Sequence, residues 1–378
     1  MRQHFPILER GTYLASHSLG AVPRATEEAL REYYRLWAER GILAWDGPWW
    51  AAVEEFSSRI ERLLKAAPGT VVPFPNATRG MAAVASALDF SGPRNKVIMT
   101  DLEFTTAYPF WRNQEHHGAR IVVISSSDGV SVPLERLIEA LDEETLLVFT
   151  SHVYFRSGAV QDLAALARAA AGVGAYSMGD GYQAAGTIEV DLAALGVDFY
   201  VGGCHKWLCG GPGAGYLYCR PDRIQGLRPR LTGWFGLQEP FEYEPGHGVG
   251  KVHDGVYRFL DGTPNIPGLY AAREGLRLVE EVGLARIRSH SLRLTDRIVE
   301  GADRLGFTVR TPREHAQRGG MICLDFPGSR QACDALVAAG VTVDWRPDCG
   351  LRVSPHFYND ESDLERFFEL LPQGSLTT

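Results

Sequence analysis

The stretch "VGGCHKWLCGGPGAGYLY" occupies residues 201–218 and places a single lysine, Lys206, among glycines, aromatic residues and small residues. It overlaps the apolar run "VDFYVGG" (197–203), which is typical of a buried strand. The glycines after the lysine leave room for a bulky planar group beside the backbone. An amine held there and partly removed from water has a lowered pKa and can condense with an aldehyde. The alternative is a lysine whose ammonium group simply reaches the surface.

Apolar runs upstream of this stretch are short and bounded by Gly, Asp or Ser, and segments with helical periodicity lie between them. The predicted strands are "KVIMTD" (96–101), "ARIVVISS" (119–126), "TLLVFTS" (145–151) and "GAYSMGD" (174–180). The predicted helices are "VPLERLIEALDE" (132–143) and "DLAALARAAAG" (162–172). This alternation predicts an α/β fold with a large, mostly parallel sheet.

The pattern changes after Pro264. Residues 268–306 form one long stretch at helical spacing, which "GGMICLDF" (319–326) and the helical "SRQACDALVAAG" (329–340) follow. We therefore expect residues 1–263 to form an amino-terminal segment and a large domain. Residues 264–378 are expected to form an interdomain helix and a smaller α+β domain.

The bulk composition excludes several classes of partner. The net charge of the 378 residues is -8, and Lys and Arg do not cluster as a nucleic-acid surface requires. No apolar stretch approaches the roughly 20 residues that span a bilayer, and the amino end lacks the apolar core of a secretory signal, so we expect a cytoplasmic protein without a membrane partner. The six cysteines form no CxxC pair, and we expect no metal site.

Two motifs supply what a pyridine-aldehyde phosphate cofactor needs besides an amine. Asp180 ends the strand 174–180, so it and Lys206 lie at carboxyl ends of strands, where open α/β sheets bind ligands. A carboxylate there can hold a ring nitrogen protonated, although an Asp before Gly181 also begins turns. In "NATRG" (76–80), Ala77 and Thr78 begin a helix, whose free N–H groups bind phosphate or are met by an ordinary N-cap.

Taken together, "DGYQ" (180–183) and "GGCHKWL" (202–208) resemble the motifs of the class V aminotransferase branch of the fold-type I pyridoxal phosphate enzymes. The likeness extends over nearly the whole chain and implies the aspartate aminotransferase-like fold. It implies that Lys206 carries the cofactor as a Schiff base, that Asp180 holds the pyridine nitrogen and that Gln183 contacts the phenolic oxygen. The implied substrate is a small molecule, an α-amino acid.

The same resemblance assigns further roles. Phe104, in "DLEFTTAYPFW" (101–111), takes the position that stacks on the cofactor ring, where many relatives have His. Thr78 and His205 are implied to bind the phosphate. Gly262 and Thr263 match a segment that reaches the phosphate of the neighbouring subunit, which implies a homodimer with shared active sites.

Arg352, in "LRVSPHFYN" (351–359), matches the arginine that binds the substrate α-carboxylate. A guanidinium suits this role because it makes two parallel hydrogen bonds to a carboxylate. Without the resemblance, a surface cation near the carboxyl end would be the simpler interpretation.

Within the branch, the chain most resembles the kynureninases. The segments that carry this likeness are "HSLGAVP" (17–23), "LTGWFGLQEP" (231–240) and "YRFLDGTPNI" (257–266). It implies hydrolytic cleavage of the Cβ–Cγ bond of an aromatic amino acid, with Trp234 reaching a phosphate across the dimer. Trp45 lies in "RGILAWDGPWW" (40–50), which corresponds to the segment that shapes the aryl pocket. Both tryptophans are equally suited to a packed core.

Three departures from the kynureninase pattern leave the reaction open. His205 replaces the tyrosine before the lysine, Gln183 replaces a histidine, and the aryl-pocket segment differs. A class V aminotransferase is therefore the second hypothesis. A cysteine desulfurase ranks third because Cys349 lies before Arg352 rather than after it. A non-catalytic binding protein of this fold is the fourth, and the intact set of site residues weighs against it.

Overall fold

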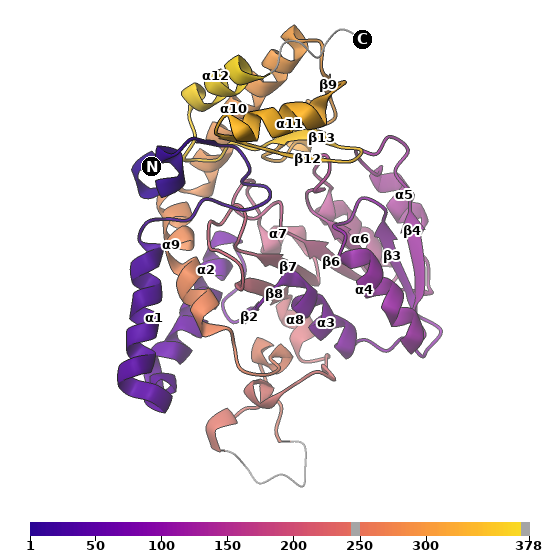
Figure 1. Ribbon diagram of the computed structural model, residues 1–378. Helices are drawn as coiled ribbons and strands as arrows, with labels where there is room; N and C mark the ends of the chain where they lie inside the picture. Colours follow the sequence, from indigo (N-terminus) through magenta and orange to yellow (C-terminus); the bar gives the residue numbers. More distant parts are fainter. Residues whose placement is uncertain (243–249, 372–378) are drawn as a thin grey trace.

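The computed structural model describes residues 1–242 and 250–371. A seven-stranded sheet lies at the centre of the large body, and a smaller layered unit covers one end of it (Figure 1). The strand order is β2-β8-β7-β6-β5-β3-β4. The parallel strands are β3 (Lys96–Thr100), β4 (Arg120–Ile124), β5 (Thr145–Ser151), β6 (Tyr176–Asp180) and β7 (Phe199–Gly203).

The five strands predicted between residues 96 and 203 are thus confirmed. Two further strands at one edge were not predicted, namely β8 (Gly215–Cys219), which is antiparallel to β7, and β2 (Val71–Phe74), which is antiparallel to β8. They extend the sheet past β7, so the end of β7, where Lys206 follows, lies inside the sheet rather than at its edge.

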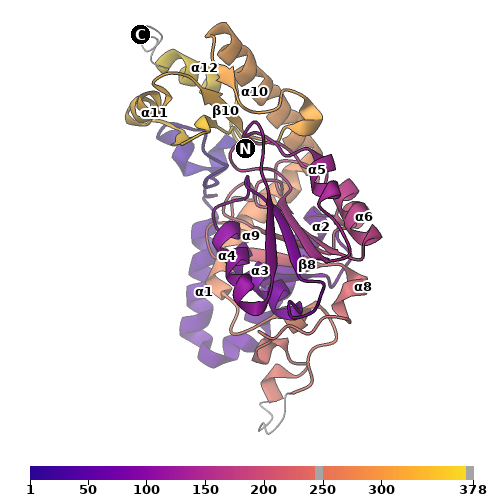
Figure 2. The same ribbon diagram turned by 90° about the vertical axis from the view of Figure 1, so that its right-hand side faces the viewer.

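Helices cover both faces of this sheet, as Figure 2 shows from the side. Alternate residues of β3 belong to different clusters, with Val97 packing among the residues of one face and Ile98 among those of the other, as the period of two requires. One face carries α3 (Ala77–Ala87) and α4 (Ala107–Asn113), and the other carries α5 (Leu134–Glu139) and α6 (Leu163–Gly172). The short helices α7 (Leu192–Leu195) and α8 (Pro221–Ile224) follow β6 and β8.

Local chemistry sets where these helices begin. Asn76 accepts a hydrogen bond from the backbone N–H of Arg79 at 3.0 Å, so α3 starts immediately beside the cavity described below. Asp162 caps α6 in the same way. The helix α5 is shorter than the predicted 132–143, because Pro133 stands at its N-cap and the chain turns after Glu139.

The amino-terminal helices α1 (Thr26–Arg40) and α2 (Trp50–Leu63) pack against α9 (Ile266–Val282) beside the sheet (Figure 1). The stretch predicted at helical spacing over 268–306 is helical in the structure apart from one break. It forms two helices, α9 and α10 (Leu284–Arg304), because Gly283 adopts a φ of 82°, a left-handed conformation that interrupts a helix.

The smaller unit has an antiparallel sheet of order β12-β13-β10-β9, covered by helices. Its elements are β9 (Thr308–Val309), β10 (Ile322–Asp325), α11 (Ser329–Ala338), β11 (Val341–Thr342), β12 (Asp344–Arg346), β13 (Gly350–Val353) and α12 (Glu361–Leu370). The short strand β1 (Thr12–Tyr13) pairs with β11, so the amino-terminal segment joins this unit. The predicted division at residues 263 and 264 stays a prediction. None of the described helices is both long and apolar enough to cross a membrane.

Candidate active site

A cavity of about 180 Å³ lies at the carboxyl edge of the central sheet, beside the amino end of α3. Seven predicted site residues line it: Ala77, Thr78, Phe104, Asp180, Gln183, His205 and Lys206. Its other lining residues are Asn76, Thr106, Ser151, Val153, Phe155 and Tyr182. Segments far apart in the sequence therefore meet here in the way that the motifs predict.

Lys206 follows β7 and is 8% exposed. Its Nζ lies 5.2 Å from the ring centroid of Phe104 and 4.9 Å from that of Tyr182. Burial lowers the pKa of the amine to about 8. The negative charge of Asp180 raises this pKa, and the positive charge of Arg352 lowers it. The free amine is consequently accessible near neutral pH, as condensation with an aldehyde requires.

The turn that carries Lys206 is fixed from two sides. The backbone N–H of Cys209 donates to the Lys206 carbonyl at 3.0 Å, and the N–H of Gly20 donates to the His205 carbonyl at 2.8 Å. A Cβ at Gly20 would lie only 2.0 Å from the Lys206 carbonyl oxygen. Only glycine therefore lets the amino-terminal segment approach the lysine turn so closely.

Asp180 ends β6 and is buried, and its Oδ1 accepts the backbone N–H of Tyr182 at 2.8 Å. Burial raises the pKa of its carboxyl group, whereas the Tyr182 hydrogen bond and the charge of Lys206 lower it. The hydrogen bond to Tyr182 also has the form of a turn-initiating Asp, and the contact of Asp180 with a ring nitrogen stays a prediction. A cationic ring nitrogen in the cavity would offset the cost of burying this carboxylate.

Gln183 is held on both of its amide atoms. Its Nε2 donates to the carbonyl of His17 at 3.0 Å, and its Oε1 accepts the indole N–H of Trp207 at 2.8 Å. The side chain is therefore immobilised beside Lys206. The contact with a phenolic oxygen stays a prediction.

The other end of the cavity offers neutral hydrogen-bond donors. Ala77 and Thr78 lie in the first turn of α3, where backbone N–H groups favour an anion. The Nδ1 of His205 lies 3.0 Å from the hydroxyl of Tyr182. Burial lowers the pKa of His205 to about 4, so its imidazole is neutral near pH 7, and an Nδ1 that accepts the Tyr182 proton leaves Nε2 as a donor.

Two residues of the site were missed by the sequence analysis. Tyr182 stands inside the quoted "DGYQ" motif, but only the structure shows its ring against Lys206. Glu103 precedes Phe104 and lies beneath the cavity, where its carboxylate accepts from the hydroxyls of Thr100 at 2.7 Å and Ser151 at 2.6 Å. Burial raises the pKa of Glu103 to about 7, against the effect of these hydrogen bonds.

The remaining predicted residues do not line this cavity within the described chain. Trp45 and Trp234 both pack on Phe235, at ring-centroid distances of 5.4 and 4.1 Å. Gly262 and Thr263 line a separate cavity of about 90 Å³ near the end of β2. The roles predicted for these four residues in a shared or aryl-binding site stay predictions.

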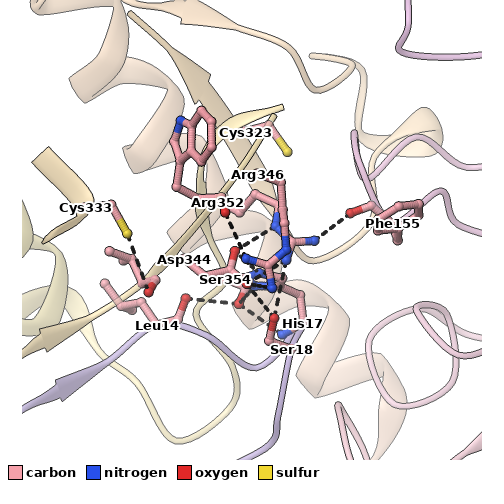
Figure 3. Close-up of polar contacts among 12 residues, drawn as sticks. Leu14, His17, Ser18, Phe155, Cys323, Cys333, Asp344, Arg346, Arg352 and Ser354 are labelled. Atoms are coloured by element: carbon pink, nitrogen blue, oxygen red, sulfur yellow. Dashed lines mark hydrogen bonds and ion pairs between the residues drawn. The ribbon is translucent and has the colours of Figure 1, made fainter. Parts of the chain in front are cut away.

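Arg352 lies on β13 and belongs to a cluster of polar contacts with Asp344, Ser18 and the carbonyl of Phe155 (Figure 3). Phe155 itself lines the Lys206 cavity, and the charge of Arg352 affects the pKa of Lys206. The arginine is therefore close to the cavity, across Phe155.

The assembled groups suit one chemistry. A buried amine with a pKa near 8, a buried carboxylate, two aromatic faces and a helix amino end together match an aromatic aldehyde that carries a ring nitrogen and a phosphate. Among the residues that the structure describes, no group of three or more His, Cys, Asp or Glu is arranged to hold a metal ion.

Comparisons with known proteins show the family of the chain. The family model described as "Aminotransferase class-V" matches residues 12–367. The chain is 31% identical over 366 residues to "Uncharacterized aminotransferase YcbU" of Bacillus subtilis (strain 168), covering 96% of this chain and 94% of that protein. It is 30% identical over 361 residues to a kynureninase of Pseudomonas fluorescens, covering 92% of this chain and 84% of that protein.

Solved structures share the fold. A structure of a lysine-to-alanine mutant of C-DES, described as having glycine covalently linked to the PLP cofactor, superposes with a TM-score of 0.89 at 21% identity, covering 98% of each chain. The apo cysteine desulfurase of Thermococcus onnurineus NA1 superposes with a TM-score of 0.86 at 24% identity, covering 98% of this chain and 96% of that one.

Proposed function

The chain belongs to the class V aminotransferase family of pyridoxal-phosphate-dependent enzymes, and from this premise we propose that it cleaves the Cβ–Cγ bond of an aromatic α-amino acid hydrolytically, as kynureninases do. The observation that carries the enzymatic part is the Lys206 amine, which lies 5.2 Å from the ring centroid of Phe104 and 4.9 Å from that of Tyr182 in the cavity that Asp180 also lines.

The residues present fit pyridoxal phosphate. Lys206 would bind its aldehyde, Asp180 its ring nitrogen and Phe104 one face of its ring, with Gln183 at the phenolic oxygen. Ala77, Thr78 and His205 would hold the phosphate. Bound in this way, the cofactor supplies an electron sink for the negative charge that develops at the substrate Cα.

Lys206 is the side chain best suited to the proton transfers. With a pKa near 8, it can take a proton from Cα and return it near neutral pH. Phe104 cannot exchange protons. Tyr182 and His205, which also line the cavity, can donate hydrogen bonds, but burial raises the pKa of the Tyr182 hydroxyl and lowers the pKa of His205 to about 4, so neither exchanges its proton readily near neutral pH.

The kynureninase-type reaction is favoured by the sequence resemblance over most of the chain and by aromatic side chains at the cavity, Phe104, Phe155 and Tyr182. Transamination is the second candidate, because the similarity to the Bacillus subtilis aminotransferase is as strong and because His205 replaces the kynureninase tyrosine. Against desulfurase chemistry, none of the described residues lining the cavity is a cysteine, and burial raises the pKa of the Cys349 thiol.

We further infer that the protein is a homodimer with shared active sites. Gly262 and Thr263 lie outside their own Lys206 cavity, where they are free to serve a neighbouring subunit. Helix α1 presents exposed apolar side chains, Tyr34 at 68% and Trp37 at 56% exposure, which a second subunit would cover.

Product analysis tests the reaction. The cofactor-loaded protein is incubated with L-kynurenine in the presence of a 2-oxo acid, which accepts the amino group if transamination occurs, and the products are separated and identified. Alanine and anthranilate in equal amounts support the hydrolase, and Lys206→Ala serves as the control without turnover. A cyclised keto acid in place of anthranilate would overturn the hydrolase in favour of transamination, and no turnover of either kind would exclude kynurenine as the substrate.

A further inference from the structure

The guanidinium of Arg352 already has a carboxylate partner in its own chain. Arg352 and Asp344 lie opposite each other in the register of β13 and β12. The Nε of Arg352 donates to Asp344 Oδ1 at 2.7 Å and its Nη2 donates to Oδ2 at 2.6 Å (Figure 3). Asp344 therefore takes one whole edge of the planar fork, the edge formed by Nε and Nη2.

Asp344 is in turn held from the amino-terminal segment. Ser18 donates its hydroxyl proton to Oδ2 at 2.6 Å, and the Nε2 of His17 lies 2.9 Å from Oδ1. Burial opposes the ionisation of Asp344, but the hydrogen bonds and charges of His17 and Arg352 hold the pKa of its carboxyl group well below its usual range. Asp344 is thus an anion at every pH at which the enzyme is expected to work.

The other edge of Arg352 faces a different environment. Its Nη1 donates to the Phe155 carbonyl at 2.9 Å, and its Nη2 makes a longer contact of 3.3 Å with the Ser18 hydroxyl. These contacts use four of the five N–H groups that a guanidinium carries. One Nη1 proton is left without a partner among the described residues, at the end of the fork formed by Nη1 and Nη2.

The cluster is connected directly to the cavity. Phe155, whose carbonyl Arg352 contacts, lines the cavity with its side chain. The carbonyl of His17 accepts the hydrogen bond from Gln183, which also lines it. Figure 3 shows Arg352 approached by Phe155 on one side and by Ser18 and Asp344 on the others.

We propose that Asp344 is a positioning residue for substrate recognition: it fixes the guanidinium of Arg352 so that the unpaired N–H of Nη1, at the Nη1–Nη2 end, receives the α-carboxylate of the amino acid. This inference rests on the proposed function and on the carboxylate-binding role that the sequence resemblance predicts for Arg352. Asp344 also pairs with Arg346 at 3.2 Å, so the cluster of one carboxylate and two guanidinium groups keeps a net positive charge while hydrogen-bond geometry sets the direction from which a carboxylate binds.

A double-mutant cycle tests whether Asp344 acts through Arg352. Asp344→Asn, Arg352→Gln and the double variant are loaded with pyridoxal phosphate, and L-phenylalanine is titrated while the cofactor absorbance is followed. We expect Asp344→Asn to lower the affinity for L-phenylalanine about tenfold, which corresponds to about 1.4 kcal/mol. When Arg352→Gln is already present, adding Asp344→Asn should not lower the affinity further. L-phenylalaninamide, which lacks the carboxylate, should bind all variants alike, and the dissociation constant of pyridoxal phosphate should not change.

The matched control is Asp325→Asn, which removes an aspartate that pairs with Arg310 at 3.3 Å elsewhere on the same small sheet. It should bind L-phenylalanine as the wild type does. The proposal is overturned if Asp344→Asn binds L-phenylalanine as tightly as the wild type or tighter, or if its effect adds fully to that of Arg352→Gln. It is also overturned if Asp344→Asn lowers the affinity for L-phenylalaninamide as much as the affinity for L-phenylalanine.

A variant with a smaller structural effect covers the case in which Asp344→Asn does not fold. Ser18→Ala removes one donor to Asp344 and the 3.3 Å contact with Arg352 Nη2 but leaves the ion pair in place, so we expect a loss of about threefold in L-phenylalanine affinity. An unchanged affinity would also overturn the proposal. A wild-type protein that shows no cofactor band would instead contradict the proposed function, and this inference with it.

Discussion

The amine of Lys206 should titrate near pH 8 in the protein without cofactor, and this expectation is open to a direct test. Burial is the main cause of the lowered pKa, and the charges of Asp180 and Arg352 modify it in opposite directions. An ordinary lysine amine has a pKa of about 10.4, so at pH 7 about 1 amine in 2,500 is neutral. With a pKa of about 8, roughly 1 in 10 is neutral.

Reductive methylation reports this fraction, because only the neutral amine reacts with formaldehyde. The apoprotein is labelled with formaldehyde and cyanoborohydride at pH values from 6 to 10, and the label on the Lys206 peptide is quantified by mass spectrometry. Exposed Lys65 corrects for changes in reagent reactivity. The midpoint of the Lys206 curve, rather than its absolute rate, is the measured quantity, because burial also slows access of the reagent.

Two variants fix the sign. Asp180→Asn removes a negative charge that raises the pKa of Lys206, so its midpoint should lie below that of the wild type. Arg352→Gln removes a positive charge that lowers this pKa, so its midpoint should move upward. A wild-type midpoint near 10, or midpoints that neither variant changes, would refute the burial argument for an activated amine.

Three further predictions concern stability and cofactor binding. Burial lowers the pKa of His152 to about 4 from 6.5, so between these pH values the unfolded chain binds more protons than the folded one, and the free energy of unfolding falls as the pH falls through them. When urea unfolding is measured at pH 7 and at pH 4.5, the decrease in the free energy of unfolding should be smaller in His152→Gln than in the wild type by up to about 3 kcal/mol. Equal decreases in the wild type and the variant would contradict this. In Gly203→Ala the new Cβ would lie 2.0 Å from the Tyr182 hydroxyl oxygen and would displace the Tyr182 side chain. The affinity for pyridoxal phosphate should therefore fall at least about tenfold in an equilibrium titration, while the circular dichroism spectrum stays unchanged. An unaltered affinity would show that Tyr182 does not support the cofactor. Asn76→Ala removes the N-cap of α3. The free energy of unfolding measured by chemical denaturation should fall by about 1 kcal/mol, and cofactor binding should weaken. If the variant unfolds and binds the cofactor as the wild type does, the role of this helix end is contradicted.

Much of the central sheet could be predicted because its strands are short apolar runs buried on both faces. The strand β5 is buried at every residue from Thr145 to Ser151. The edge strands were harder to recognise, since β2 is four residues long and contains Pro73. The break between α9 and α10 depends on Gly283, and a single glycine within a helical pattern does not by itself show where a helix ends.

The proximity of Asp180 and Lys206 could be predicted because Asp180 ends β6 and Lys206 follows the neighbouring strand β7. The role of Tyr182 could not, because the direction of its side chain depends on the space above Gly203. The ion pair of Asp344 with Arg352 could not be predicted either, because the two residues lie opposite each other only through the register of β12 and β13. Ser18 reaches the same cluster through the pairing of β1 with β11, far away in the sequence.

The central claim is that Lys206 carries pyridoxal phosphate, and borohydride trapping tests it most directly. Apoprotein is mixed with pyridoxal phosphate, its absorbance is recorded, and the bond is reduced and located by peptide mass spectrometry. The account predicts an absorbance band near the visible edge, a phosphopyridoxyl group on Lys206, and the loss of both in a folded Lys206→Ala protein. No band, or a label found on another lysine and retained in Lys206→Ala, would contradict it.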